Sequence, residues 1–71
     1  MRRQTLDDLA TQGAKLRVFF PHDQGSRVLV TTGGSRPNTS PAPCQSDWEV
    51  KDPVTGQNEW VPGWYIASPT R

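Results

Sequence analysis

Alternating apolar and polar side chains predict the first strand of this chain. In KLRVFF at 15–20, Leu16, Val18 and Phe20 point to one side and the residues between them point to the other. A period of two is typical of a half-buried strand. The β-branched run SRVLVTT at 26–32 predicts a second strand. Pro and Gly bound the five residues between these two segments, so we expect a turn there.

Three further strands are predicted in the second half of the chain. DWEVK at 47–51 forms a third strand and QNEWV at 57–61 a fourth. Between them, DPVTG at 52–56 predicts a hairpin turn, because its Pro presets its own φ and its Gly supplies a positive φ. A Pro-Gly step ends the fourth strand, and WYIA at 64–67 predicts a short fifth strand.

The N-terminal segment predicts a short helix over residues 5–12. Leu6, Leu9 and Ala10 fall on one face at helical spacing. Acidic residues occupy the first turn, where they interact favourably with the helix dipole, and Gly13 is a natural terminator. Two turns of helix are not stable alone, so this apolar face must pack on something. Whether it packs on the sheet or on a partner stays open.

The segment GGSRPNTSPAPCQS at 33–46 has no apolar periodicity and contains three prolines. We expect a loop that is extended in places and is the most mobile internal part of the chain. A loop of this length in so small a domain is unusual and is often functional. Lengthening a surface loop also costs little entropy, so both interpretations of its length stay open.

These elements fit one small, mainly β domain over residues 1–71. The chain has 71 residues, of which seven are Pro and six are Gly, and so many turn residues suit short strands better than long helices. A domain of this size buries only about 60% of the surface that its unfolded chain exposes, which leaves little room for a deep substrate pocket. The fold that we expect has five strands over 15–67 and one helix over 5–12.

The chemistry-bearing residues do not form the pattern of an enzyme, metal or cofactor site. Cys44 and His22 are single in the sequence, so they complete neither a disulfide nor a zinc site. No Ser lies in a nucleophile-elbow motif. We therefore expect a non-enzymatic protein without catalytic residues, cofactors or metal ions. A single Cys fits a reducing, cytoplasmic location, and no apolar stretch approaches the length of a membrane span.

The stretch DWEVKDPVTGQNEWVPGWYI at 47–66 resembles the C-terminal half of a Src-homology-3 domain. In that family a Trp opens a strand and a hairpin with Thr-Gly near its tip follows. The next strand ends in an aromatic, an aliphatic and a Pro, and a Tyr and an aliphatic come two residues later. The matching positions here are Trp48, Thr55-Gly56, Trp60-Val61-Pro62 and Tyr65-Ile66. The resemblance covers roughly a third of the chain and implies a five-stranded, strongly bent barrel with an aromatic peptide-binding groove.

The resemblance implies that Trp48, Pro62 and Tyr65 lie in this groove, and Trp64 adds apolar area beside them. We expect these four residues to form a partner-binding site, whereas Trp60 is expected in the core. The family's long acidic loop after the first strand is replaced here by the short PHDQG segment. This removes one wall of the groove and most of the acidic residues that pair with a ligand's arginine. The expected ligand is therefore a folded surface of a partner protein and not a proline-rich tail.

The leading hypothesis is a small protein-binding module, an inhibitor or adaptor that acts by occluding a surface of its partner. The initial Met and the small size suit a complete short reading frame, as expected for an accessory protein of a bacterium or bacteriophage. The identity of the partner and the oligomeric state stay open.

The alternative is a nucleic-acid-binding small β-barrel. The formal net charge is +1, and no run of Lys or Arg exists to neutralise a row of phosphates. The candidates for a basic stripe are therefore only Lys15, Arg17, Arg27 and Arg36.

Overall fold

Five antiparallel strands form a single sheet in the computed structural model, which describes residues 4–13, 15–37 and 46–70. The strands are β1 (Lys15–Phe20), β2 (Gly25–Pro37), β3 (Ser46–Lys51), β4 (Asn58–Pro62) and β5 (Ala67–Pro69). They lie in the order β4-β3-β2-β1-β5, so β4 and β5 form the two edges and the sheet is not closed. The predicted mainly β fold class is confirmed.

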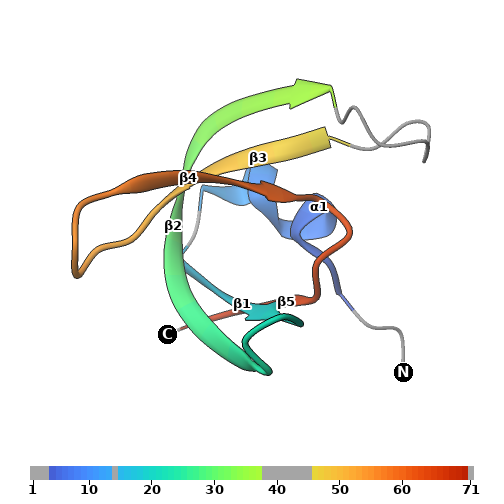
Figure 1. The fold of residues 1–71 in the computed structure, drawn as a ribbon. Coiled ribbons are helices and arrows are strands. Elements are labelled where there is room, and N and C mark those ends of the chain that lie inside the picture. Colours follow the sequence, from blue (N-terminus) through green and yellow to red (C-terminus); the bar gives the residue numbers. More distant parts are fainter. Residues whose placement is uncertain (1–3, 14, 38–45, 71) are drawn as a thin grey trace.

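Strand β2 joins the two arms of the sheet, because its first half pairs with β1 and its second half pairs with β3. Within the half that pairs with β3 the register shifts, from Thr31 opposite Val50 to Ser35 opposite Trp48. Gly33 lies in this bulge with a φ of 87°, which Gly adopts without steric cost. Because a bulge bends a strand and increases its twist, β2 curves from the β1–β5 arm to the β3–β4 arm (Figure 1).

The prediction that the second strand ends at Gly33, where a loop over 33–46 would begin, is wrong. The positive φ of this glycine absorbs the register shift, so pairing with β3 resumes beyond it and continues to Pro37. Strand β3 itself already begins at Ser46. The rest of the predicted loop, residues 38–45, lies outside the described residues, and its mobility stays a prediction.

The hairpin turn predicted at 52–56 is confirmed. The amide of Gly56 donates to the carbonyl of Asp52 at 2.8 Å, and Gly56 has a φ of 77°. The Asp52 carboxylate accepts from the amide of Val54 at 2.8 Å. The side chain of Asp52 therefore closes the tip of the β3–β4 hairpin, as Asp commonly does in turns.

The fifth strand begins later than the predicted 64–67. Residues 63–65 form a turn and bend after β4, in which the amide of Tyr65 donates to the carbonyl of Pro62 at 3.2 Å. Pairing with β1 begins only at Ala67. The Pro-Gly step thus turns the chain back toward β1 before a strand can form.

The predicted helix is confirmed as α1 (Leu6–Leu9), which continues as a 3-10 turn over Ala10–Gln12 and ends at Gly13 in the left-handed conformation. It packs on the sheet, between the β3–β4 arm and the β1–β5 arm (Figure 1). Just before the helix, Thr5 forms an antiparallel bridge with Ile66. The N-terminal segment therefore pairs with the chain that leads into edge strand β5.

Among the described residues, nine apolar side chains form one core shared by the helix and every strand. They are Leu6, Leu9, Ala10, Leu16, Val18, Leu29, Val50, Val61 and Ala67. The alternation predicted for 15–20 is confirmed, since Leu16 and Val18 are buried and Phe20 packs against the core.

The prediction that Trp60 lies in the core is wrong, since this side chain is 38% exposed. Neighbouring residues of a strand point to opposite faces, and Val61 takes the inward position of β4, opposite Trp48. Trp60 lies opposite Glu49 on the outer face. There the guanidinium of Arg36 lies 4.4 Å from the centre of its ring.

Gly63 lies where the turn after β4 meets the first turn of α1. Its carbonyl accepts from the amide of Asp7 at 2.9 Å, and its own amide donates to the carbonyl of Ser46 at 2.8 Å. A Cβ at this buried position would overlap the carboxylate of Asp7. Gly at this position therefore lets the first turn of α1 lie this close to the turn after β4.

We predict that Gly63→Ala lowers the free energy of unfolding by about 1–3 kcal/mol, because the added methyl group displaces the Asp7 carboxylate and with it α1. Gly25→Ala is the control, since a Cβ there meets the nearest backbone oxygen at an ordinary 3.7 Å and should change stability by no more than about 0.5 kcal/mol. Urea unfolding followed by Trp fluorescence measures both. Equal stability of the two variants would show that α1 does not depend on close approach at Gly63.

Candidate functional site

An exposed aromatic cluster forms where the turn after β4 meets the end of β1. The ring centroids of Trp64 and Tyr65 are 4.5 Å apart, and the ring of Phe20 stands edge-on to Tyr65 at 5.7 Å. Trp64 is 46% exposed, whereas Phe20 and Tyr65 are half-buried and pack against the core. We call Phe20, Trp64 and Tyr65 the aromatic cluster. Edge-to-face contacts of this kind stabilise aromatic pairs beyond the area they bury. Exposed Trp64 is therefore supported by Tyr65, which itself packs against Phe20 and the core.

Arg27 gives the aromatic cluster a polar border. Its guanidinium lies 4.2 Å from the centre of the Phe20 ring. The same group pairs with Glu59 at 2.8 Å and approaches Asp52 at 3.9 Å. Because these groups are partly exposed, each ion pair contributes only about 0–1 kcal/mol, but together they hold the guanidinium over the ring. The positive charge of Arg27 beside the aromatic cluster is thus paired within the protein.

The structure brings together two of the four residues predicted to bind a partner. Trp64 and Tyr65 are in contact. In the strand register Pro62 lies opposite Asp47, the neighbour of Trp48, so alternation points Trp48 and Pro62 to opposite faces of the sheet. Both of these side chains are half-buried.

Trp48 has a hydrogen-bond partner inside the protein. Its ring packs against the core, and its indole Nε1–H donates to Oδ1 of Asp7 at 2.7 Å. Since Asp7 belongs to α1, this bond connects the helix to β3. The contact gives Trp48 a structural role, and a role in binding stays a prediction.

Sequence reasoning did not include Phe20 in the candidate site. The alternation of residues 15–20 predicts an inward position for Phe20, and its place as the last residue before the turn is the signal that points to the site. A strand end lies at the rim of the core, where a large ring is only partly covered. There Phe20 meets Tyr65, which is far away along the chain.

The arginines named for the nucleic-acid alternative differ in their partners. Arg36 donates through Nε to Asp47 at 3.3 Å, and Arg27 pairs with carboxylates as described above. Arg17 donates through Nη1 to the hydroxyl of Ser26 at 3.5 Å. Two of the three arginines in the described residues therefore neutralise acidic groups of their own fold, which weakens the positive field that phosphate binding requires.

The metal-ligating residue types are dispersed in the described part of the chain. Within residues 4–13, 15–37 and 46–70, no group of three or more His, Cys, Asp and Glu side chains is arranged to hold a metal ion. His22 lies exposed in the turn between β1 and β2, and Cys44 lies outside these ranges. No helix of the same ranges combines the length and apolar character that spanning a membrane requires.

Comparison of the chain with protein-family models, curated proteins and solved structures found no match. The resemblance of residues 47–66 to Src-homology-3 domains therefore stays an interpretation of the sequence.

We predict that Trp48→Phe lowers the free energy of unfolding by about 1–3 kcal/mol, because it leaves the part-buried Asp7 carboxylate without its indole donor. Asp7→Asn should cost less, since the amide oxygen still accepts from the indole. Trp60→Phe is the control on an exposed ring and should stay within about 0.5 kcal/mol of the parent. Chemical denaturation measures all three. A larger loss for Asp7→Asn than for Trp48→Phe would contradict the assignment of this contact.

Proposed function

We propose that this protein is a non-enzymatic protein-binding module with the form of a Src-homology-3-like barrel. The strand order and the bend of β2, which both arms share, support the barrel form. The helix α1 between the arms adds to the enclosure of the core (Figure 1). The resemblance of residues 47–66 supports the same form from the sequence.

The observation that carries the binding function is the exposure of Trp64 on the aromatic cluster. Trp and Tyr are the residue types whose truncation most often weakens a protein interface. Here Trp64 contacts Tyr65, which is held by Phe20 and the core. A ring supported in this way loses little further conformational freedom on binding, so more of its contact energy contributes to affinity.

The short connection between β1 and β2 favours a folded partner surface over a proline-rich peptide. It consists only of residues 21–24, so no long acidic loop stands beside the aromatic cluster to pair with an arginine of a peptide. The nearby carboxylates of Asp52 and Glu59 already lie against Arg27. Binding through Trp64 would cover part of the partner's surface, which is how we propose the protein acts.

The test begins with affinity capture from the native host, with the full chain as bait, and continues with the purified partner. Trp64→Ala should weaken binding at least tenfold, a change of ~1.4 kcal/mol, because it removes the most exposed ring of the aromatic cluster. Trp60→Ala is the matched control, since it removes another exposed tryptophan from the outer face and should change Kd less than about threefold. Isothermal titration calorimetry measures both.

Tyr65→Ala should also weaken binding at least tenfold. Circular dichroism accompanies this variant, because Tyr65 packs against the core. The proposal is wrong if Trp64→Ala and Tyr65→Ala bind the partner as the parent does while Arg27→Ala or Arg36→Ala abolishes binding. If the protein then binds nucleic acid with an affinity that falls steeply with salt, the nucleic-acid-binding alternative replaces the proposal.

A further inference from the structure

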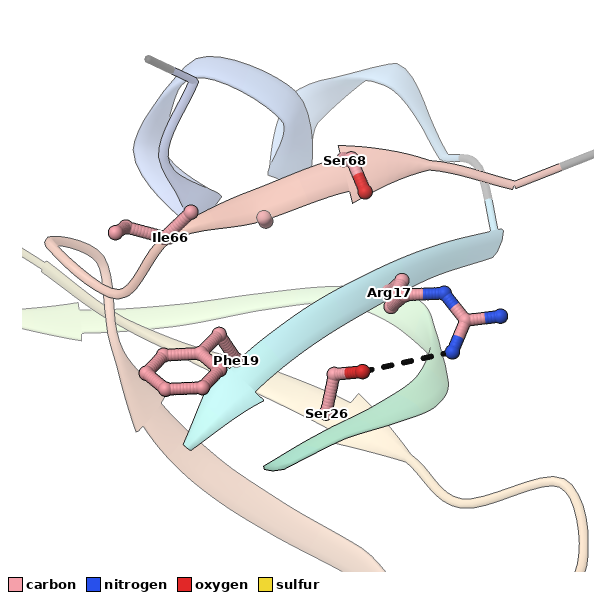
Figure 2. A pocket seen from close by; sticks show the side chains of 6 residues that line it. Arg17, Phe19, Ser26, Ile66 and Ser68 are labelled. Carbon is pink, nitrogen blue, oxygen red and sulfur yellow. Dashed lines mark hydrogen bonds between the residues drawn. The ribbon is translucent and has the colours of Figure 1, made fainter. Parts of the chain in front are cut away.

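A groove of about 440 Å³ lies on the outer face of β1 and the segment that contains β5. Its lining combines apolar side chains, one cation and two hydroxyl groups (Figure 2). The lining residues are Arg17, Phe19, Ser26, Ile66, Ala67 and Ser68. Its volume lies within the range of roughly 300–1,000 Å³ that is typical of ligand sites.

The strand register sets the positions of the groove's apolar and charged ends. Alternation along β1 places Arg17 and Phe19 on the face away from the core. The amide of Phe19 donates to the carbonyl of Ile66 at 2.9 Å, so these two residues are neighbours across the strands, and each is 38% exposed. Arg17 lies opposite Ser68. The groove therefore has an apolar end at Phe19 and Ile66 and a cationic end at Arg17.

Two of the three arginines in the described residues each lie over an aromatic ring and pair with a carboxylate of the protein. The third arginine, Arg17, lacks this arrangement. The two groups are Arg27 with Phe20 and Glu59, and Arg36 with Trp60 and Asp47.

Arg17 has no carboxylate partner among the described residues. It lies two residues from exposed Phe19 on the same face of β1. The hydrogen bond that the structure gives its guanidinium goes to the neutral hydroxyl of Ser26, at the long distance of 3.5 Å (Figure 2). No Asp or Glu of the described residues pairs with it, and the residues outside that part contain neither Asp nor Glu. An acidic side chain for Arg17 would therefore have to come from another molecule.

We propose that this groove binds an extended segment of a partner protein in which an apolar side chain and a carboxylate stand two residues apart. The carboxylate pairs with Arg17, and the apolar side chain packs on Phe19 and Ile66. Residues two apart in an extended chain lie on one side of it, about 6.6 Å from each other. Arg17 and Phe19 are separated by the same two residues along β1, so one extended segment reaches both ends of the groove. The hydroxyl of Ser68 adds a donor beside the carboxylate.

The groove is separate from the aromatic cluster. Phe20 and Tyr65 pack against the core, whereas their chain neighbours Phe19 and Ile66 are exposed on the opposite face. The inference therefore does not rest on the proposed function of Trp64. Substitutions in one surface should leave binding at the other unchanged.

NMR titration of the ¹⁵N-labelled full chain tests the proposal with two capped peptides, acetyl-Ala-Leu-Ala-Glu-Ala-amide and its counterpart with Gln in place of Glu. At about 10 mM peptide, roughly tenfold above a millimolar Kd, the Glu peptide should shift the amide signals of Arg17, Phe19 and Ser68. The Gln peptide should bind at least threefold more weakly, because it cannot form the charge-assisted pair with Arg17.

Three variants assign the contacts. Arg17→Met keeps the apolar stem and should weaken the Glu peptide at least threefold while removing the preference for Glu over Gln. Phe19→Ala should weaken both peptides equally. Lys15→Met is the matched control, because it removes a positive charge from the same face of β1 but outside the groove lining, and it should change Kd less than about 1.5-fold.

Four outcomes would overturn the proposal: no shifts at these residues, equal affinity for the two peptides, shifts confined to other surfaces, and a Lys15→Met effect as large as that of Arg17→Met. A single-stranded oligouridylate is the last probe. If it shifts the groove signals more strongly than the Glu peptide does, and salt removes the effect, the groove belongs to nucleic acid and the proposal is again overturned.

Discussion

Hydrogen bonds from the start of α1 reach both arms of a sheet that the strand ladder leaves open. Asp7 bonds to the β3–β4 arm, and Leu6 bonds to the chain that leads into β5. Strands β4 and β5 are edges and do not pair with each other. The amide of Asp7 donates to the carbonyl of Gly63 after β4, and its carboxylate accepts from the indole of Trp48 on β3. The preceding amide, of Leu6, donates to the carbonyl of Tyr65 just before β5. A hydrogen bond to a part-buried carboxylate is stronger than one between neutral groups, and this one connects α1 to β3.

The core and the candidate site both depend on this connection. Three of the nine core side chains, those of Leu6, Leu9 and Ala10, come from the helical segment, and a domain this small has little other apolar surface to bury. Because the Leu6 amide bonds to Tyr65, the same helix start also positions the aromatic cluster. The helix thus links stability to the presentation of Trp64, although no residue of α1 belongs to the cluster.

The elements set by short stretches of chain could be predicted. The alternation of residues 15–20 placed Leu16 and Val18 inward, and the turn chemistry of DPVTG located the hairpin tip at 52–56. Helical spacing and Gly13 gave the extent of the N-terminal helix. In each case the deciding hydrogen bonds and side-chain periods lie within a few residues of one another. Of the candidate site, Tyr65 was predicted from the resemblance of residues 47–66 to Src-homology-3 domains, and Trp64 was added as the apolar residue next to it.

Only the tertiary structure decided which way the ambiguous residues turn. A glycine pair can either end a strand or form a bulge within it. Gly33 forms a bulge because the chain beyond it pairs with β3. The inward residue of β4 depends on its register against β3, which buries Val61 and leaves Trp60 outside. Phe20 contacts Tyr65 only because the fold brings these distant parts of the chain together. The tertiary structure also decides that Arg17, alone among the described arginines, has no carboxylate partner and bonds to the hydroxyl of Ser26. The sequence by itself determined local conformation and the alternation of side chains. Curvature and register, which arise only when distant strands pair, decided which surfaces those side chains form.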